Sequence, residues 1–178
     1  MHWVRIAILA ALAITLAACM PAKPASPMAT ATRARIVGAP NADLMSVEHD
    51  GRVHATSISK SGAEVPYPVT DGGWLTDKEF REVLSAVHFT KPPDAIAGCC
   101  FPRHAVLFYD AHGHYLGYLS ICFECGCADM WPYNPPRKDE SWIDWDGEVF
   151  ERIVTAHKLT PIAPSIKESS IPPAIAGG

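Results

Sequence analysis

The sequence predicts an α+β fold in which helices pack on one side of a small antiparallel sheet built from two hairpins. Three observations carry this prediction. Two segments show apolar runs on either side of a glycine turn, two others have apolar residues at helical spacing, and the order is strands, helix, strands, helix. Strands joined by short turns are antiparallel, and helices that follow runs of strands favour the α+β class.

Leu44 to Ser59 is predicted to form the first hairpin. Asp50-Gly51 is a strong short-range signal for a tight turn, because the turn needs a left-handed backbone that glycine adopts freely. Strand-forming residues lie on either side of it, namely Val47, Val53 and Ile58.

A helix is predicted from Asp77 to about His88. Thr76 and Glu79 have the spacing of a capping box, in which each side chain accepts a hydrogen bond from the other residue's backbone N–H. One helix face is apolar, formed by Phe80, Val83, Leu84 and Val87. Pro92-Pro93 cannot continue a helix.

Arg103 to Phe123 is predicted to form the second hairpin. Ala105–Tyr109 is apolar at every position, which is typical of an inner strand buried on both faces. The turn is either His112-Gly113 or Ala111-His112-Gly113, and the chain returns from Tyr115.

The last predicted helix runs from about Asp146 to His157, with Val149, Phe150, Ile153 and Val154 facing inward. The segment before it is rich in tryptophan and proline, and includes Trp131, Trp142 and Trp145. We interpret this segment as a loop whose tryptophans cover the open sheet face. The alternative is a binding face for a glycan or an extended peptide.

Residues 1–18 have the features of an export signal. A basic start precedes an apolar run, Ile6–Ala18, that is shorter than the ~20 residues of a membrane span. Leu16-Ala17-Ala18-Cys19 resembles the lipobox of bacterial lipoproteins. That resemblance implies cleavage before Cys19 and lipid chains on Cys19 that anchor the protein in a membrane. Met20, where inner-membrane lipoproteins often carry Asp, implies the outer membrane and a periplasm-facing domain.

The chain ends are predicted to lie outside the folded domain. Residues 19–40 are rich in Pro, Ala, Ser and Thr, and prolines interrupt every pattern in 161–178. Such segments bury too little apolar surface to fold. We therefore expect a flexible tether at 19–40, a cysteine-cluster domain at 41–160 and a disordered tail at 161–178. The net charge of −4 offers no basic surface for nucleic acid.

All cysteines after Cys19 fall within one short stretch: Cys99, Cys100, Cys122, Cys125 and Cys127. A two-residue turn in the second hairpin places Cys100 opposite Cys125, and a three-residue turn places Cys99 there. Paired strands hold Cα atoms about 4.5–5.5 Å apart, which suits a disulfide. In an oxidising compartment we therefore expect a cross-hairpin disulfide. An odd number of cysteines leaves at least one thiol unpaired within the chain.

The same cluster allows a metal site or an exchange-active thiol. Cys100, His104, Cys122 and Cys125 offer the ligand set of a Cys3His zinc centre. An extended strand separates positions 100 and 104 by about 13 Å, so this site needs a sharp turn, which Pro102 can supply. Adjacent Cys99 and Cys100 also give Cys125 two alternative partners and thus permit disulfide exchange.

Other polar residues near the second hairpin carry weaker signals. Arg103 and His104 are placed to activate a thiolate or to fix the sheet end by hydrogen bonds. His112 and His114 are candidates for zinc or copper, but no third ligand lies near them in sequence and a solvated turn is the simpler interpretation. The sequence contains no Ser-His-Asp constellation, glycine-rich phosphate loop or helix-borne His pair, so it favours a protein that is not an enzyme.

Two motifs resemble those of a group of uncharacterised bacterial exported proteins and lipoproteins. They are Cys100-Phe101-Pro102-Arg103-His104-Ala105 and Ile121-Cys122-Phe123-Glu124-Cys125. The group carries Cys-Phe-x-Pro-Arg-His, so the first motif is one residue shorter here and its cysteine is either Cys99 or Cys100. The resemblance implies a site that includes Arg103 and Glu124 beside the cysteines and His104. It implies no reaction.

Two functional hypotheses follow from the sequence. The first is a non-enzymatic envelope lipoprotein whose domain, stapled by a cross-hairpin disulfide, binds or assembles with a protein or glycan partner. The second is a periplasmic protein that binds zinc or copper, or exchanges disulfides, through the Cys/His cluster.

Overall fold

The computed structural model describes residues 26–93, 100–133, 135, 137 and 139–160. The predicted export signal, the lipidation site Cys19, Cys99 and the tail at 161–178 lie outside the described residues. Within that described part, no helix is both long enough and apolar enough to cross a membrane.

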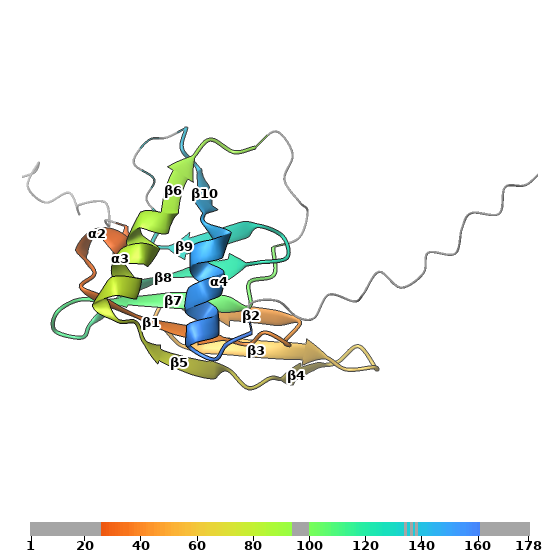
Figure 1. Cartoon of the computed structure of the whole chain (residues 1–178). Helices are drawn as coiled ribbons and strands as arrows, with labels where there is room; N and C mark the ends of the chain where they lie inside the picture. The colour runs from red at the N-terminus through yellow and green to blue at the C-terminus, as the bar shows by residue number, and fades with distance from the viewer. Residues whose placement is uncertain (1–25, 94–99, 134, 136, 138, 161–178) are drawn as a thin grey trace, which may run out of the picture.

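A five-stranded antiparallel sheet forms the centre of the fold (Figure 1), with strand order β5-β1-β7-β8-β9. The middle strand β7 is buried at five of its six positions, as its apolar run predicts. The α+β class with antiparallel strands is thus confirmed. The strands are β1 (Arg33–Gly38), β5 (Thr70–Trp74), β7 (His104–Tyr109), β8 (Tyr115–Cys122) and β9 (Cys127–Trp131).

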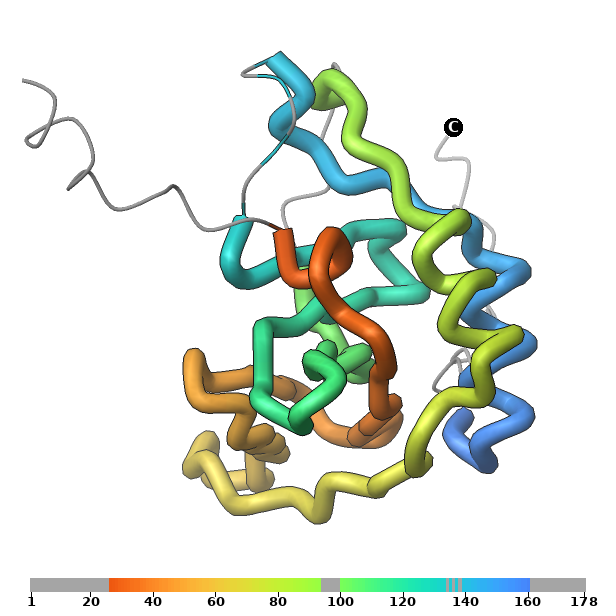
Figure 2. The backbone as a smooth tube through the Cα atoms, turned by 90° about the vertical axis from the view of Figure 1, so that its left-hand side faces the viewer, coloured from red at the N-terminus to blue at the C-terminus, as the bar shows by residue number. Residues whose placement is uncertain are grey.

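The two faces of this sheet pack against different partners. Successive side chains of a strand point to opposite faces, so Val106 and Phe108 join a core beneath the helices whereas Ala105 and Leu107 join a second core on the other face. Helices α3 (Asp77–Ala86) and α4 (Gly147–Ala156) lie together on one side of the sheet (Figure 2). A four-residue helix, α2 (Pro27–Thr30), precedes β1.

The first predicted hairpin is confirmed, but it belongs to a separate sheet. Val47 pairs with Val53, and Gly51 between them has φ 87°. Its strands form a three-stranded sheet in the order β2-β3-β4, and this sheet covers the second core. The strands are β2 (Leu44–Val47), β3 (Val53–Ile58) and β4 (Glu64–Pro66).

Both predicted helices form, and both are capped. The capping box of Thr76 and Glu79 is present at α3, and the Asp146 side chain accepts two backbone N–H bonds at the start of α4. Helix α3 ends at Ala86 and not near His88. The chain continues as β6 (Val87–Thr90), because β10 (Trp142–Trp145) offers it an antiparallel partner.

The predicted tether is wrong for its second half. Strand β1 lies between β5 and β7, and its Ala34 and Ile36 have no exposed surface. Alternation explains this burial, because Arg33 and Arg35 point to the opposite face from Ala34 and Ile36. The fold therefore begins before residue 41.

The tryptophan-rich segment is not the expected loop. Trp131 lies in β9, while Trp142 and Trp145 lie in β10. The Trp145 ring meets Phe123 and Phe150 edge to face, with centroids 5.2 and 5.5 Å apart. Trp145 therefore covers apolar core beside α4 from a strand.

Candidate thiol–disulfide site

The end of the β8–β9 hairpin gathers three cysteines around one tight turn. Cys122, the last residue of β8, pairs directly with Cys127, the first residue of β9. The turn between them contains Cys125 and then Gly126, whose φ of 63° is a left-handed conformation that favours glycine. A short, closed turn therefore keeps the three sulfurs close together.

The disulfide joins Cys100 to Cys127, with Cα atoms 5.9 Å apart. The predicted partner Cys125 is wrong. The two-residue-turn register does hold from His104↔Ile121 to Phe108↔Gly117, but β8 ends at Cys122 and the register stops there. The next strand, β9, brings Cys127 within reach of Cys100 in place of Cys125.

Cys122 and Cys125 are the free cysteines among the described residues. Their Sγ atoms are 2.6 Å apart and share a hydrogen bond, and the Cys125 backbone N–H donates to the Cys122 Sγ at 3.3 Å. Burial raises the pKa of the Cys122 thiol, and its hydrogen bond with Cys125 adds to the rise. Cys122 therefore keeps its proton at neutral pH, while Cys125 is half-buried.

The disulfide lies next to the free pair. The Sγ atoms of Cys122, Cys125 and Cys127 lie within 4.8 Å of one another, and Cys127 is bonded to Cys100. We call these four residues the sulfur cluster. A dithiol next to a disulfide is the arrangement that thiol–disulfide exchange requires.

The structure does not bring His104 into the sulfur cluster. His104 pairs with Ile121, and both point toward the helices, so the next residue, Cys122, points to the opposite face. The His104 ring packs edge to face on Phe123, with centroids 5.3 Å apart. The Cys3His ligand set is thus divided between two faces of the sheet.

His104 is also poorly solvated. Its side chain is 1 % exposed, and neither ring nitrogen has a hydrogen-bond partner among the described residues. Burial lowers the pKa of His104 to about 4. The backbone of Thr160 partly opposes this lowering of the His104 pKa, although it forms no hydrogen bond with the ring. The neutral imidazole is therefore part of the apolar core.

The remaining predicted residues lie beside the cluster or far from it. Arg103 forms an ion pair with Glu124 at 2.6 Å, which ties the segment before β7 to the cysteine turn. His112 and His114 lie at the other end of β8, in the β7–β8 loop, where Asp110 accepts hydrogen bonds from both backbones. Among the described residues, the groupings that could hold a metal ion do not include either histidine.

Comparison of the chain with protein-family models, curated proteins and solved structures finds no match.

Proposed function

We propose that this protein is a thiol–disulfide exchange protein of the bacterial envelope, in which the sulfur cluster passes a disulfide between the Cys100–Cys127 pair and the Cys122–Cys125 pair. The supporting observation is the 4.8 Å grouping of three sulfurs, one of which already belongs to a disulfide. The exposure of the cysteines indicates where an outside molecule enters the exchange, because Cys100 is exposed whereas Cys122 is 2 % exposed. Outside molecules therefore meet Cys100 first.

The internal exchange needs two steps, each an attack by a thiolate on a disulfide sulfur. The Cys125 thiolate attacks the Cys127 Sγ; the Cys125–Cys127 bond forms, and Cys100 leaves with the bonding electrons and takes up a proton. Deprotonated Cys122 then attacks the Cys125 Sγ, and Cys127 leaves and takes up a proton. One disulfide and two thiols exist before and after, so no outside oxidant is consumed.

The cellular setting of the proposal comes from the sequence. Lipidation at Cys19 would hold the domain on the periplasmic side of the outer membrane, where disulfides persist. Replacing Cys19 by Ser is expected to release the protein from the membrane fraction, which fractionation and the mass of the N-terminal peptide test directly. An unchanged distribution of this variant would exclude the anchor.

Disulfide mapping tests the exchange. The detergent-solubilised chain is equilibrated in buffers of reduced and oxidised dithiothreitol, quenched with acid, alkylated and analysed by mass spectrometry. We expect Cys100–Cys127 and Cys122–Cys125 disulfides to interconvert, and Cys125→Ser to block the interconversion. Cys99→Ser is the matched control, because the proposed steps do not use Cys99.

A Cys100–Cys127 bond that never exchanges would contradict the proposal. The failure of a Cys125–Cys127 disulfide to appear in Cys122→Ser, which retains the first step and lacks the second, would also contradict it. Either result favours the first hypothesis from the sequence, a non-enzymatic binding or assembly module with a structural crosslink.

A second candidate function is metal binding by the same sulfur cluster after reduction. Four thiolates bind zinc tetrahedrally at about 2.3 Å, and soft thiolates also suit Cu(I). The grouping of three sulfurs supports this candidate, with Cys100 in place of His104 as the fourth ligand. Metal analysis of the reduced chain tests it: one zinc or copper per chain supports it, and a metal-free reduced chain excludes it.

A further inference from the structure

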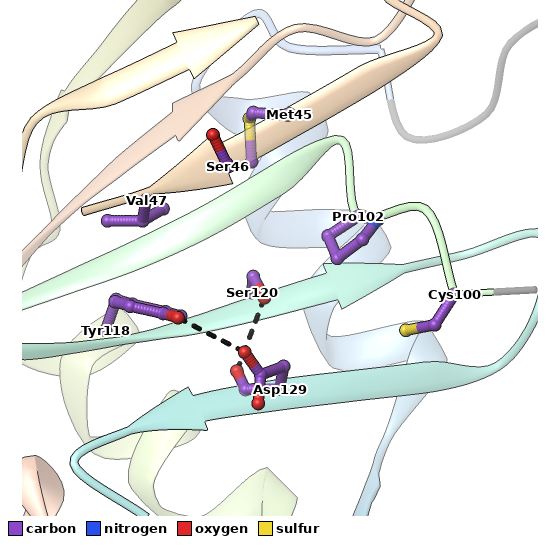
Figure 3. A pocket seen from close by; sticks show the side chains of 8 residues that line it. All are labelled: Met45, Ser46, Val47, Cys100, Pro102, Tyr118, Ser120 and Asp129. Atoms are coloured by element: carbon purple, nitrogen blue, oxygen red, sulfur yellow. Dashed lines mark hydrogen bonds between the residues drawn. The ribbon is translucent and has the colours of Figure 1, made fainter. Parts of the chain in front are cut away.

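A pocket of about 350 Å³ opens beside the exposed half of the disulfide. It lies between β2 of the three-stranded sheet and strands β8 and β9 of the central sheet (Figure 3). Its volume is at the small end of the range for small-molecule sites. The lining residues are Met45, Ser46, Val47, Cys100, Pro102, Tyr118, Ser120 and Asp129.

The pocket reaches the disulfide from one side only. Cys100 belongs to its lining whereas Cys127 does not, and Cys127 is 6 % exposed. Figure 3 shows the Cys100 sulfur directed into the space between Pro102 and Asp129. A molecule in the pocket therefore meets the Cys100 Sγ before any other sulfur of the cluster.

Asp129 is the charged residue of this lining, whose described residues include no cation. The Asp129 carboxylate accepts a hydrogen bond from the Tyr118 hydroxyl at 3.2 Å. Burial, with a smaller contribution from the Asp129 charge, raises the pKa of Tyr118 to about 12, so Tyr118 remains a neutral donor. The nearby Arg103 is paired with Glu124. The pocket therefore has apolar and hydroxyl-bearing walls and one negative charge.

We infer that this pocket admits thiols that carry a positive charge, with Asp129 as the residue that selects them. The inference rests on the proposed exchange function. The incoming thiolate attacks the Cys100 Sγ, a mixed disulfide forms, and Cys127 leaves with the bonding electrons and takes up a proton. A second thiolate from the substrate then attacks the substrate sulfur of the mixed disulfide and releases Cys100. Two substrate thiols are oxidised to a disulfide, and the Cys100–Cys127 disulfide is reduced.

Rates of reduction with thiols of opposite charge test this selection. The probes are cysteamine, which is cationic, and 3-mercaptopropionate, which is anionic, and the readout is the alkylation of Cys127, the thiol that the first attack releases, after quenching at timed intervals. The ratio of the two rates is measured for wild type, for Asp129→Asn and for a charge-matched control, Asp139→Asn, whose carboxylate lies outside the pocket lining. Intrinsic differences between the two thiols cancel when the ratios of the proteins are compared.

The expected result is a cysteamine preference about tenfold larger in wild type than in Asp129→Asn. This value combines the attraction of the cationic probe and the repulsion of the anionic probe, each with a unit charge that passes about 6 Å from the carboxylate in a water-like dielectric. The Asp139→Asn control keeps the wild-type ratio, and salt reduces the preference. Equal ratios in wild type and Asp129→Asn overturn the charge selection and leave the exchange function intact. A disulfide that neither thiol reduces overturns both.

A pair of capped dipeptides distinguishes a small aminothiol from a cysteine within a polypeptide. Lys-Cys and Glu-Cys amides, acetylated at the N-terminus, place the charge on a neighbouring side chain. A Lys-Cys preference that Asp129→Asn abolishes assigns the pocket to polypeptide cysteines beside basic residues. A preference seen with cysteamine alone assigns it to small aminothiols.

Discussion

Replacement of His104 by Leu is expected to make the fold less sensitive to acid. The imidazole of His104 is 1 % exposed, without a hydrogen-bond partner among the described residues, and burial lowers its pKa to about 4. In the unfolded chain the pKa returns to about 6.5. Between these two values the His104 imidazole is protonated in the unfolded state and neutral in the folded state. The free energy of unfolding therefore decreases as the pH falls from 6.5 to 4.

The size of this effect follows from the pKa difference. Each unit of pKa difference corresponds to 1.36 kcal/mol, so a decrease from about 6.5 to about 4 gives roughly 3 kcal/mol. This part of the free energy of unfolding is fully present above pH 6.5 and is lost as the pH approaches 4. A domain is typically stable by about 5–15 kcal/mol, so wild type is expected to lose a large part of its stability in this window.

Urea denaturation followed by tryptophan fluorescence at several pH values between 4 and 7.5 measures the effect. The His104→Leu variant is expected to lose about 3 kcal/mol less than wild type across this range. His112→Gln, at a solvated loop, is the matched control and keeps the wild-type slope. If wild type and His104→Leu show the same pH dependence, the argument from burial is refuted. His104→Leu should also leave disulfide exchange unchanged, because His104 lies on the opposite face of the sheet from Cys122.

Three further predictions concern the caps, the turns and the free thiols. Thr76→Ala is expected to lower the free energy of unfolding by about 1 kcal/mol, because the capping box at α3 is lost; an unchanged urea midpoint would argue against this cap. Gly117→Ala is expected to destabilise the fold far more than Gly62→Ala. Both glycines have a positive φ, which alone costs an alanine about 1–2 kcal/mol. A Cβ at Gly117 would also collide with the Trp131 carbonyl, whereas nothing lies within 4 Å of a Cβ at Gly62. Soluble yield and melting temperature compare the two. In the native chain, iodoacetamide is expected to modify Cys122 more slowly than Cys125, with a midpoint above the ordinary pKa of 9.0; equal rates in mass spectrometry would contradict the burial of Cys122.

Local signals in the sequence predicted the elements that short-range contacts stabilise. The turn at Asp50-Gly51, the capping box at Thr76 and the apolar run at Ala105–Tyr109 each rest on neighbouring residues, and the structure confirms all three. Strand β1 has no such local signal, because its partners, β5 and β7, are distant in sequence. Its alternating Arg33-Ala34-Arg35-Ile36 was the available signal, hidden by the proline-rich residues before it.

The disulfide partner of Cys100 differs from the prediction because strand register holds only within the paired strands. The predicted register is present in the strands of the second hairpin, but it does not reach Cys125, which lies beyond the end of β8. Gly126 between Cys125 and Cys127 was a turn signal, and a turn there makes Cys127, not Cys125, the first residue of the next strand. The pocket residue Asp129 could not be predicted, since its role depends on the packing of β2 against β8 and β9.

The alternation of side chains in β8 places the core beneath the helices and the sulfur cluster on opposite faces of the central sheet. Leu119 and Ile121 enter the core beneath the helices, as does His104 opposite them, whereas Tyr118, Ser120 and Cys122 point to the other face. The same rule places Cys127 and Asp129, which pair directly with Cys122 and Ser120, on that second face. The sulfur cluster and the pocket therefore share the face that carries the second core, whereas the face beneath the helices carries apolar packing and none of the cluster's sulfurs. A substitution beneath the helices should change the stability of the fold without changing the exchange reaction.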